Sequence, residues 1–166
     1  MSESIRIRAA REEDSPALCT IYNQGIEDRL ATLETDLRTP RERAQWLAGR
    51  SERTPVLVAI RAEEVLGFGS LNTFNPRACY RFVADFSIYV AREARGQGVG
   101  KALLARLERD ARALGYHKLV LSAFPWNEAG LRLYHGAGFR TVGTYEEMGR
   151  LDDKWVDTLI LEKLLS

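Results

Sequence analysis

Apolar and polar residues follow two different periods along this chain. Alternating or short continuous apolar runs are typical of strands, and apolar residues three or four positions apart are typical of helices. The pattern predicts strands at residues 4–10, 55–61, 65–74, 80–90, 117–124, 139–149 and 155–165, and helices at residues 12–25, 39–49, 98–115 and 127–138.

Capping residues mark the ends of the first two helices. Pro16 suits the first turn of the first helix, and Gly25 is expected to end it. Thr39 can cap the second helix, with Glu42 completing a capping box. Residues 26–38 between these helices have no clean period, so we expect an ordered loop there.

The predicted order is β-α-α-β-β-β-α-β-α-β-β. Mixed order with a strand–helix–strand unit in the middle predicts an α/β or α+β fold in layers, with a right-handed crossover between two parallel strands. The chain of 166 residues shows no repeat or linker, so we expect one domain, residues 1–166. The crossover helix is amphipathic, and one face carries Val99, Leu103, Leu107, Ala111 and Leu114.

Composition and charge exclude several classes of function. The formal net charge is +1, so no strong field favours nucleic acid or an anionic membrane. No apolar run is long enough to span a bilayer, and the N-terminus lacks the apolar core of a signal peptide. Cys19 and Cys79 match neither a metal-site spacing nor a disulfide framework, so we expect thiols in a reducing cytoplasm.

Three alternating glycines, Gly96, Gly98 and Gly100, lie where a predicted strand leads into a predicted helix. Glycine inside such elements costs on the order of 0.5–1 kcal/mol relative to alanine, so the bare backbone must serve some purpose. Free backbone N–H groups and the positive end of a helix converge at such a turn and bind phosphate. The loop therefore predicts an anion site; a merely tight turn is the plainer alternative.

Two familiar phosphate-binding loops do not fit this segment. A Walker A loop would need glycine at Arg95 and serine or threonine at Ala102. The dinucleotide fingerprint would need its third glycine at Lys101 or Leu103.

Two segments resemble the signatures of one enzyme family. Residues 95–100, "RGQGVG", resemble the R/Q-x-x-G-x-G/A loop of the GCN5-related N-acetyltransferase (GNAT) family. Residues 127–139, "NEAGLRLYHGAGF", resemble its N-x-x-A-x-x-x-Y-x-x-x-GF helix. The resemblance covers nearly the whole chain. It implies the GNAT fold, an α/β (α+β) fold whose mixed, mostly antiparallel sheet of about seven strands is flanked by about four helices.

The same resemblance implies acetyl-CoA as cosubstrate and names the residues that would bind it. The glycine loop would hold the pyrophosphate, and main-chain groups of residues 88–90 would pair with the pantetheine arm like an extra strand. Asn127 would contact the pantetheine, cap its helix, or do both. The implied set is Ile88, Tyr89, Val90, Arg95, Gly96, Gln97, Gly98, Val99, Gly100, Lys101 and Asn127.

A narrower resemblance concerns the acceptor. Residues 21–39, 76–90 and 149–165 resemble the branch that acetylates phosphinothricin, methionine sulfoximine and arsinothricin. This resemblance implies an amino-acid analogue as acceptor, antibiotic resistance as the setting, and a homodimer. The chain departs from the branch in two places: Asp85 stands where the branch often has Glu, and Leu33 where it often has Phe.

Acetyl transfer to an amine needs a proton acceptor for the ammonium and can use a proton donor for the thiolate. Asp85 shares a strand face with Ser87 and Tyr89, matches the family's carboxylate, and would gain a raised pKa if buried. A salt-bridged aspartate is the alternative. Tyr134 matches the family's general acid near the thioester sulfur; the alternative is a half-buried aromatic that fills space.

The acidic groups of such an acceptor favour guanidinium partners, because arginine presents a planar fork of donors. Arg81 and Tyr80 match the branch's substrate loop, and Arg77 lies close by. Glu27 is a candidate for the opposite wall. Solvation at the surface is the alternative for the arginines and for Glu27.

We therefore expect an acetyl-CoA-dependent N-acetyltransferase acting on the α-amino group of a small amino-acid analogue. Two alternatives stay open: acetylation of a peptide or protein amino terminus, and a non-catalytic CoA-binding module. Neither His117 nor His135 has a partner at ligand spacing, so no metal is expected.

Overall fold

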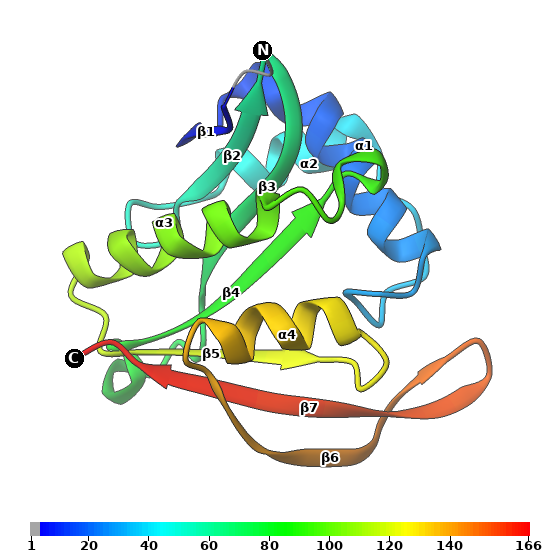
Figure 1. Cartoon of the computed structure of the whole chain (residues 1–166), viewed down its shortest axis with the longest axis vertical. Helices are drawn as coiled ribbons and strands as arrows, with labels where there is room; N and C mark the ends of the chain where they lie inside the picture. Colours follow the sequence, from blue (N-terminus) through cyan, green and yellow to red (C-terminus); the bar gives the residue numbers. More distant parts are fainter. Residues whose placement is uncertain (1–3) are drawn as a thin grey trace.

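The computed structural model describes residues 4–166, so residues 1–3 of the expected domain lie outside the described part (Figure 1). The elements follow the predicted order, and the expected fold class is confirmed by seven strands and four helices. They are β1 (Arg6–Ala9), α1 (Ser15–Glu27), α2 (Pro40–Ala48), β2 (Val56–Arg61), β3 (Glu64–Thr73), β4 (Val83–Val90), α3 (Val99–Ala113), β5 (Lys118–Ala123), α4 (Glu128–Gly136), β6 (Arg140–Leu151) and β7 (Lys154–Leu164).

The seven strands form one sheet in the order β1-β2-β3-β4-β5-β7-β6. Every neighbouring pair is antiparallel except β4 and β5, whose predicted parallel pairing is confirmed. This pairing is short, because it runs only from Val83–Lys118 to Asp85–Val120. Beyond it β4 stays paired with β3, and β5 stays paired with β7, so the sheet is split between β4 and β5.

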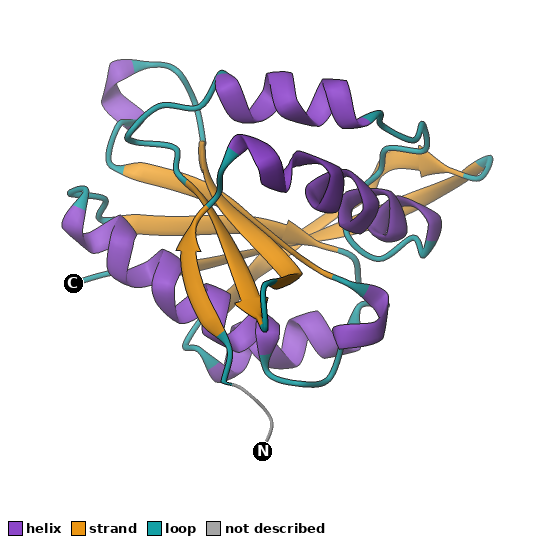
Figure 2. Cartoon of the chain, turned by 90° about the horizontal axis from the view of Figure 1, so that it is seen from above, coloured by secondary structure: helices purple, strands orange, loops and turns teal. Residues whose placement is uncertain are grey.

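Helices cover both faces of the sheet (Figure 2). Tyr22 of α1 packs edge-on against Tyr89 of β4, with ring centroids 5.0 Å apart, so α1 covers one face. Tyr134 of α4 packs against Phe86 of β4 with centroids 5.8 Å apart, so α4 covers the other. Alternate side chains of β4 therefore pack against the helices on opposite faces of the sheet.

The crossover helix α3 lies on the same face as α4. Its predicted apolar face is confirmed, since Val99, Leu103, Leu107 and Ala111 are buried. Glycines in β3 allow this close approach: a Cβ atom at Gly67 would lie 2.8 Å from the Tyr89 carbonyl oxygen and 3.0 Å from Val99 Cγ1. The approach fixes the start of α3, and hence the glycine loop, at the end of β4.

Two predicted boundaries are wrong. Gly25 does not end α1, which continues to Glu27, so the expected loop begins only after that residue. Gly25 instead makes room for an aromatic ring, because a Cβ atom there would lie 3.3 Å from Tyr89 Cδ1. Strand β4 begins at Val83 rather than residue 80, because a 3-10 turn, Ala78–Tyr80, precedes it. Thr39 caps α2 as predicted, by accepting a hydrogen bond from the Glu42 backbone N–H.

The contacts of Gly67 predict how much stability the protein loses when a side chain is added at this position of β3. Gly67→Ala should lower the free energy of unfolding by roughly 1–3 kcal/mol, because the new methyl group meets backbone that cannot easily move. Gly136→Ala is the matched control: a Cβ atom there meets nothing within 4 Å at the end of α4. It should be neutral or slightly stabilising. Urea unfolding of the two variants measures the difference, and equal stabilities would contradict the close approach of α3.

Candidate active site

The split between β4 and β5 opens into two adjoining pockets. The larger, about 310 Å³, extends from the split to the glycine loop before α3. The smaller, about 160 Å³, lies between β4, β5 and the loop after α1. Six residues line both pockets and therefore mark where they meet: Leu30, Ala31, Ile88, Tyr89, Asn127 and Tyr134.

The glycine loop has the backbone geometry of an anion cradle. Gly96 and Gly98 have φ values of 78° and 85°, a region that favours glycine, and no atom lies within 4 Å of a Cβ placed on either. Gly98 is the N-cap of α3, and the Ala102 N–H makes the first turn's bond to its carbonyl oxygen at 3.1 Å. The N–H groups between these two residues precede that bond and point toward the helix end, where a phosphate would bind.

The structure brings nearly all of the predicted acetyl-CoA residues together. Ten of the eleven line the larger pocket, namely residues 88–90, 95, 96, 98–101 and 127. Gln97 is the exception, because its side chain turns away from the pocket. It accepts a hydrogen bond from Arg61 at 2.9 Å and donates one to the Glu93 carbonyl oxygen at 3.1 Å.

Asn127 is the N-cap of α4, as the sequence predicts, and it also ties α4 to a distant loop. Its side-chain oxygen accepts the Gly130 N–H at 3.1 Å, and its amide donates to the Leu30 carbonyl oxygen at 3.3 Å. Gly130 is necessary for this arrangement, because a Cβ atom there would lie 2.6 Å from Asn127 Nδ2. Both residues line the larger pocket.

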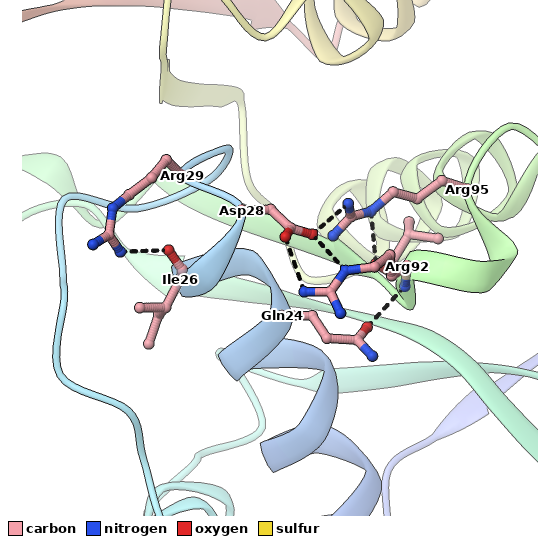
Figure 3. A network of polar contacts seen from close by, with 7 residues as sticks. Gln24, Ile26, Asp28, Arg29, Arg92 and Arg95 are labelled. Carbon is pink, nitrogen blue, oxygen red and sulfur yellow. Dashed lines mark hydrogen bonds and ion pairs between the residues drawn. The ribbon is translucent and has the colours of Figure 1, made fainter.

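A carboxylate at the end of α1 holds two arginines beside the glycine loop (Figure 3). Asp28 makes a two-bond ion pair with Arg92, at 3.0 and 2.9 Å, and accepts a further bond from Arg95 at 2.7 Å. Hydrogen bonds from Arg92, and then from Arg95, lower the pKa of the Asp28 carboxyl group. The Gln24 side chain accepts the Arg92 backbone N–H at 2.7 Å. Nothing in the local sequence around Asp28 predicts this role.

The segment after Asp28 is held by contacts to the β6–β7 turn and to Trp126. Arg29 makes a two-bond ion pair with Asp152, in the turn between β6 and β7, at 2.8 and 2.9 Å. Trp126 donates its indole N–H to the Arg29 carbonyl oxygen at 2.8 Å. Residues 28–31 are therefore held by contacts to three separate parts of the chain, and Leu30 and Ala31 among them line both pockets.

Tyr134 stands where the two pockets meet, as expected of a residue near the reacting atoms. Its side chain is buried against Phe86 and Phe139. Burial, with a smaller effect from the negative charge of Asp85, raises the pKa of the Tyr134 hydroxyl to about 12. The group is therefore protonated at neutral pH.

Asp85 is partly buried on β4, two residues before Ser87, which lines the smaller pocket. Burial raises the pKa of the Asp85 carboxyl group to about 6, and a hydrogen bond from Asn72 opposes the rise. At neutral pH the group is mostly a carboxylate with a strong tendency to accept a proton. Asp85 itself does not line either pocket of the split.

The predicted acceptor residues lie elsewhere. Arg77, Tyr80 and Arg81 line a third hollow of about 220 Å³, which shares no lining residue with the other two. Val83 also lines this hollow, and it shares the strand face of Asp85 and Ser87, so Asp85 lies between the third hollow and the smaller pocket. Glu27 is exposed and does not line these pockets.

Sequence reasoning missed much of the smaller pocket's wall. Four of its lining residues, Leu30, Ala31, Thr32 and Leu33, come from the loop that had no clean period, and Thr158 comes from β7. A loop without periodicity gives no signal of what it faces. The one signal available in the sequence was Leu33, which departs from the residue common in the branch.

Within residues 4–166 no group of His, Cys, Asp or Glu is arranged to hold a metal ion, and no helix is long and apolar enough to cross a membrane.

Comparisons with known proteins agree with this geometry. A model of the acetyltransferase (GNAT) family matches residues 18–139. The chain is 31% identical over 161 residues to the L-methionine sulfoximine/L-methionine sulfone acetyltransferase of Pseudomonas paraeruginosa, a match that covers 96% of this chain and 94% of that protein.

Two solved structures are similar over almost the entire chain. The ribosomal-protein-alanine N-acetyltransferase of Brucella melitensis has 38% identity and a TM-score of 0.92, covering 96% of this chain and 99% of that one. A phosphinothricin acetyltransferase from Sinorhizobium meliloti, in complex with acetyl-CoA, has 28% identity and a TM-score of 0.89, covering 100% of this chain and 90% of that one.

The cradle geometry predicts a specific loss when Gly98 gains a side chain. Gly98→Ala should weaken acetyl-CoA binding by at least about tenfold, or ~1.4 kcal/mol, because the methyl group obstructs the approach of the phosphate to the backbone. Gly115→Ala is the control, because Gly115 has the same φ of 85° and equally open space at the other end of α3.

Both substitutions strain the backbone alike, so they should lower the melting temperature to a similar extent. Titration calorimetry with acetyl-CoA on the folded variants separates them. Near-normal affinity in Gly98→Ala, or an equal loss in Gly115→Ala, would contradict the cradle.

Proposed function

The chain belongs to the acetyltransferase (GNAT) family, and we propose that it transfers the acetyl group of acetyl-CoA to the α-amino group of a small amino-acid analogue. The proposed acceptors carry a tetrahedral phosphorus, sulfur or arsenic group: phosphinothricin, methionine sulfoximine or sulfone, and arsinothricin. The names of the Pseudomonas and Sinorhizobium relatives support the first two classes.

The observation that carries the proposal is the split between β4 and β5. One end leads to an anion cradle, Tyr134 stands in the middle, and a partly buried carboxylate lies on the other side of β4. When bound, acetyl-CoA supplies a thioester carbonyl for the amine to attack. The β5-facing backbone groups of residues 86–90 have no strand beside them, so they are available to orient the pantetheine arm.

Asp85 is the proposed general base. An ammonium has no lone pair, so the acceptor must lose a proton before attack. Ser87 lines the smaller pocket and Asp85 does not, so we propose that the proton reaches Asp85 through one water molecule rather than directly. Tyr134 is the proposed proton donor to the departing thiolate, and its raised pKa keeps the proton available at neutral pH.

Arg77, Tyr80 and Arg81 are the proposed partners for the acidic groups of the acceptor, and their hollow shares no lining residue with the smaller pocket. Val83 in that hollow and Ser87 in the smaller pocket are four residues apart on β4, about 13 Å at the usual rise of a strand. A small acceptor whose amine lies near Ser87 is too short to bridge this distance. Binding by these arginines and Tyr80 would therefore require the segment before β4 to move toward the split.

A second candidate is acetylation of a protein amino terminus. The observation in its favour is the 38% identity to the Brucella ribosomal-protein-alanine N-acetyltransferase. Residues 28–31 argue against it, because Leu30 and Ala31 form part of the wall of both pockets and ion pairs of Asp28 and Arg29 hold this segment in place. A peptide chain would need an open groove at this place.

We also propose a homodimer that forms through the hairpin of β6 and β7. This hairpin extends from the body of the molecule (Figure 1) and exposes several large apolar side chains, among them Tyr145 (52%), Met148 (56%) and Trp155 (58%). Its outer strand β6 is a sheet edge, and edges with apolar surface are places where chains associate. Sedimentation equilibrium tests this proposal.

The proposed setting is the cytoplasm, in keeping with the free thiols of Cys19 and Cys79. Acetylation there would remove the charge on the amino group of a toxic analogue, which is a form of antibiotic resistance. Growth of an expressing strain on phosphinothricin measures that protection.

The choice of acceptor class gives the first functional prediction. With saturating acetyl-CoA, the kcat/KM for phosphinothricin, methionine sulfoximine or methionine sulfone should exceed that for an alanine-terminal peptide by at least about tenfold, or ~1.4 kcal/mol of transition-state binding. Release of free CoA thiol measures the rates. The reverse order would favour the protein-acetylating candidate, and acetyl-CoA binding without turnover of any acceptor would favour a non-catalytic module.

The proposed role of Asp85 as general base gives the second functional prediction. The wild-type kcat/KM should fall as pH drops below about 6, because Asp85 then becomes protonated. Asp85→Asn should lower kcat/KM by roughly 10²–10⁴-fold at neutral pH, and the deficit should shrink as solvent deprotonates more of the amine at higher pH.

Asp110→Asn, which removes the carboxylate that Arg106 binds on α3, is the control and should keep the wild-type profile. A deficit that stays constant with pH would mean that Asp85 orients the acceptor instead. An unchanged rate in Asp85→Asn would remove Asp85 from the mechanism.

A further inference from the structure

We infer that Arg50 and Asn72 are positioning residues that fix the Asp85 carboxyl group and keep it ready to accept a proton. The inference rests on the proposed function of Asp85, and it assigns a role to two residues outside both pockets of the split.

Asn72 faces Asp85 across the sheet. The two residues are direct partners in the β3–β4 register, so their side chains share one face. Asn72 Nδ2 donates to Asp85 Oδ1 at 3.3 Å and to Ser87 Oγ at 3.2 Å. An aspartate, one methylene shorter than glutamate, keeps its carboxyl group close to its own strand, where the short Asn72 side chain reaches it.

The orientation of the Asn72 amide follows from its other neighbours. Arg50 Nη2 lies 2.7 Å from Asn72 Oδ1, and Ser70 Oγ donates to the same oxygen at 3.0 Å. A guanidinium has donors and no acceptor, so the Asn72 atom facing Arg50 must be the oxygen. The NH₂ group must then face Asp85, and Arg50 determines which end of the amide the carboxylate meets.

Arg50 is itself fixed in place. Its Nε donates to the Thr54 carbonyl oxygen at 3.0 Å, and its Nη2 also donates to the Leu71 carbonyl oxygen at 2.5 Å. The guanidinium lies over the Trp46 ring, 4.7 Å from the centroid. These contacts hold a positive charge directly behind the Asn72 amide.

Two ionisable groups from other elements bear on Asp85. Arg50 acts from the loop after α2, through the Asn72 dipole, and Tyr134 acts from α4, where it is neutral at neutral pH. Val120, the β5 partner of Asp85, carries no charge. The donor from Asn72 is therefore the principal contact that favours the charged carboxylate against burial. Without it, a larger fraction of Asp85 would hold its proton at neutral pH, and a smaller fraction would be free to act as a base.

The test measures the Asp85 titration directly, with ¹³C NMR of the side-chain carboxyl group in the whole protein. Asn72→Leu keeps the size of the side chain and removes the donor, so the Asp85 midpoint should rise by about one unit. Arg50→Met should raise the midpoint by less, because the Asn72 amide remains but can turn. Arg50→Lys retains a donor to Oδ1 and should restore most of the wild-type value.

Arg106→Met is the control, because Arg106 is also partly buried but binds Asp110 on α3 and the Ile7 carbonyl oxygen on β1. It should leave the Asp85 midpoint unchanged. A wild-type midpoint in folded Asn72→Leu would overturn the inference. If that variant does not fold, equal midpoints in Arg50→Met and Arg50→Lys would overturn it instead.

The pH profile of kcat/KM separates the inference from the function on which it rests. If Asn72→Leu raises the Asp85 midpoint and also shifts the acid limb of the kcat/KM profile to higher pH, the positioning role of Asn72 and the proposed role of Asp85 as base both stand. If the midpoint rises and the acid limb stays in place, the positioning role of Asn72 stands, and the proposed base is refuted.

Discussion

Strand β4 is paired with β3 from Ala84 to its end at Val90, but with β5 only as far as Asp85. Aromatic side chains pack on both faces of the sheet beyond that point: Phe86, Tyr134 and Phe139 pack on one face, and Tyr89 with Tyr22 on the other. The backbone groups left open would each cost about 1–3 kcal/mol if buried without a partner. A polar guest or water must therefore occupy the split, and the geometry of the site follows from this need.

The walls of the split are held by charges rather than by strand pairing. Asp28 fixes Arg92 and Arg95 beside the glycine loop, and Arg29 fixes the turn of the β6–β7 hairpin through Asp152. Asp28 and Arg29 therefore connect the region of the glycine loop with the β6–β7 hairpin. Leu33, a few residues further on, lies so close to the hairpin that a Cβ atom at Gly149 would approach its Cδ1 to 2.7 Å. A dimer through the hairpin would border the acceptor pocket for this reason.

Local rules predicted the order of elements, the caps at Thr39 and Asn127 and the glycine cradle, because each depends on residues within one turn. They failed at Gly25, where a tertiary contact with Tyr89 decides the need for glycine. The pairing of Asn72 with Asp85 depends on strand register, which a sequence alone does not specify. The resemblance supplied Asp85 and Tyr134 as candidates, but only the structure shows that Arg77 and Arg81 lie in a separate hollow.

The sheet divides into two units at the short parallel ladder between β4 and β5. Strands β1–β4 pair with one another on one side, and β5–β7 do so on the other. A ligand seated in the split bridges the two units, so it binds only when both are folded and docked. At a concentration one hundred times its dissociation constant, such a ligand adds about 2.7 kcal/mol to stability. That gain should appear as slower amide hydrogen exchange in β7, of which only Thr158 lines a pocket of the split, because separation of β4 from β5 would require release of the ligand.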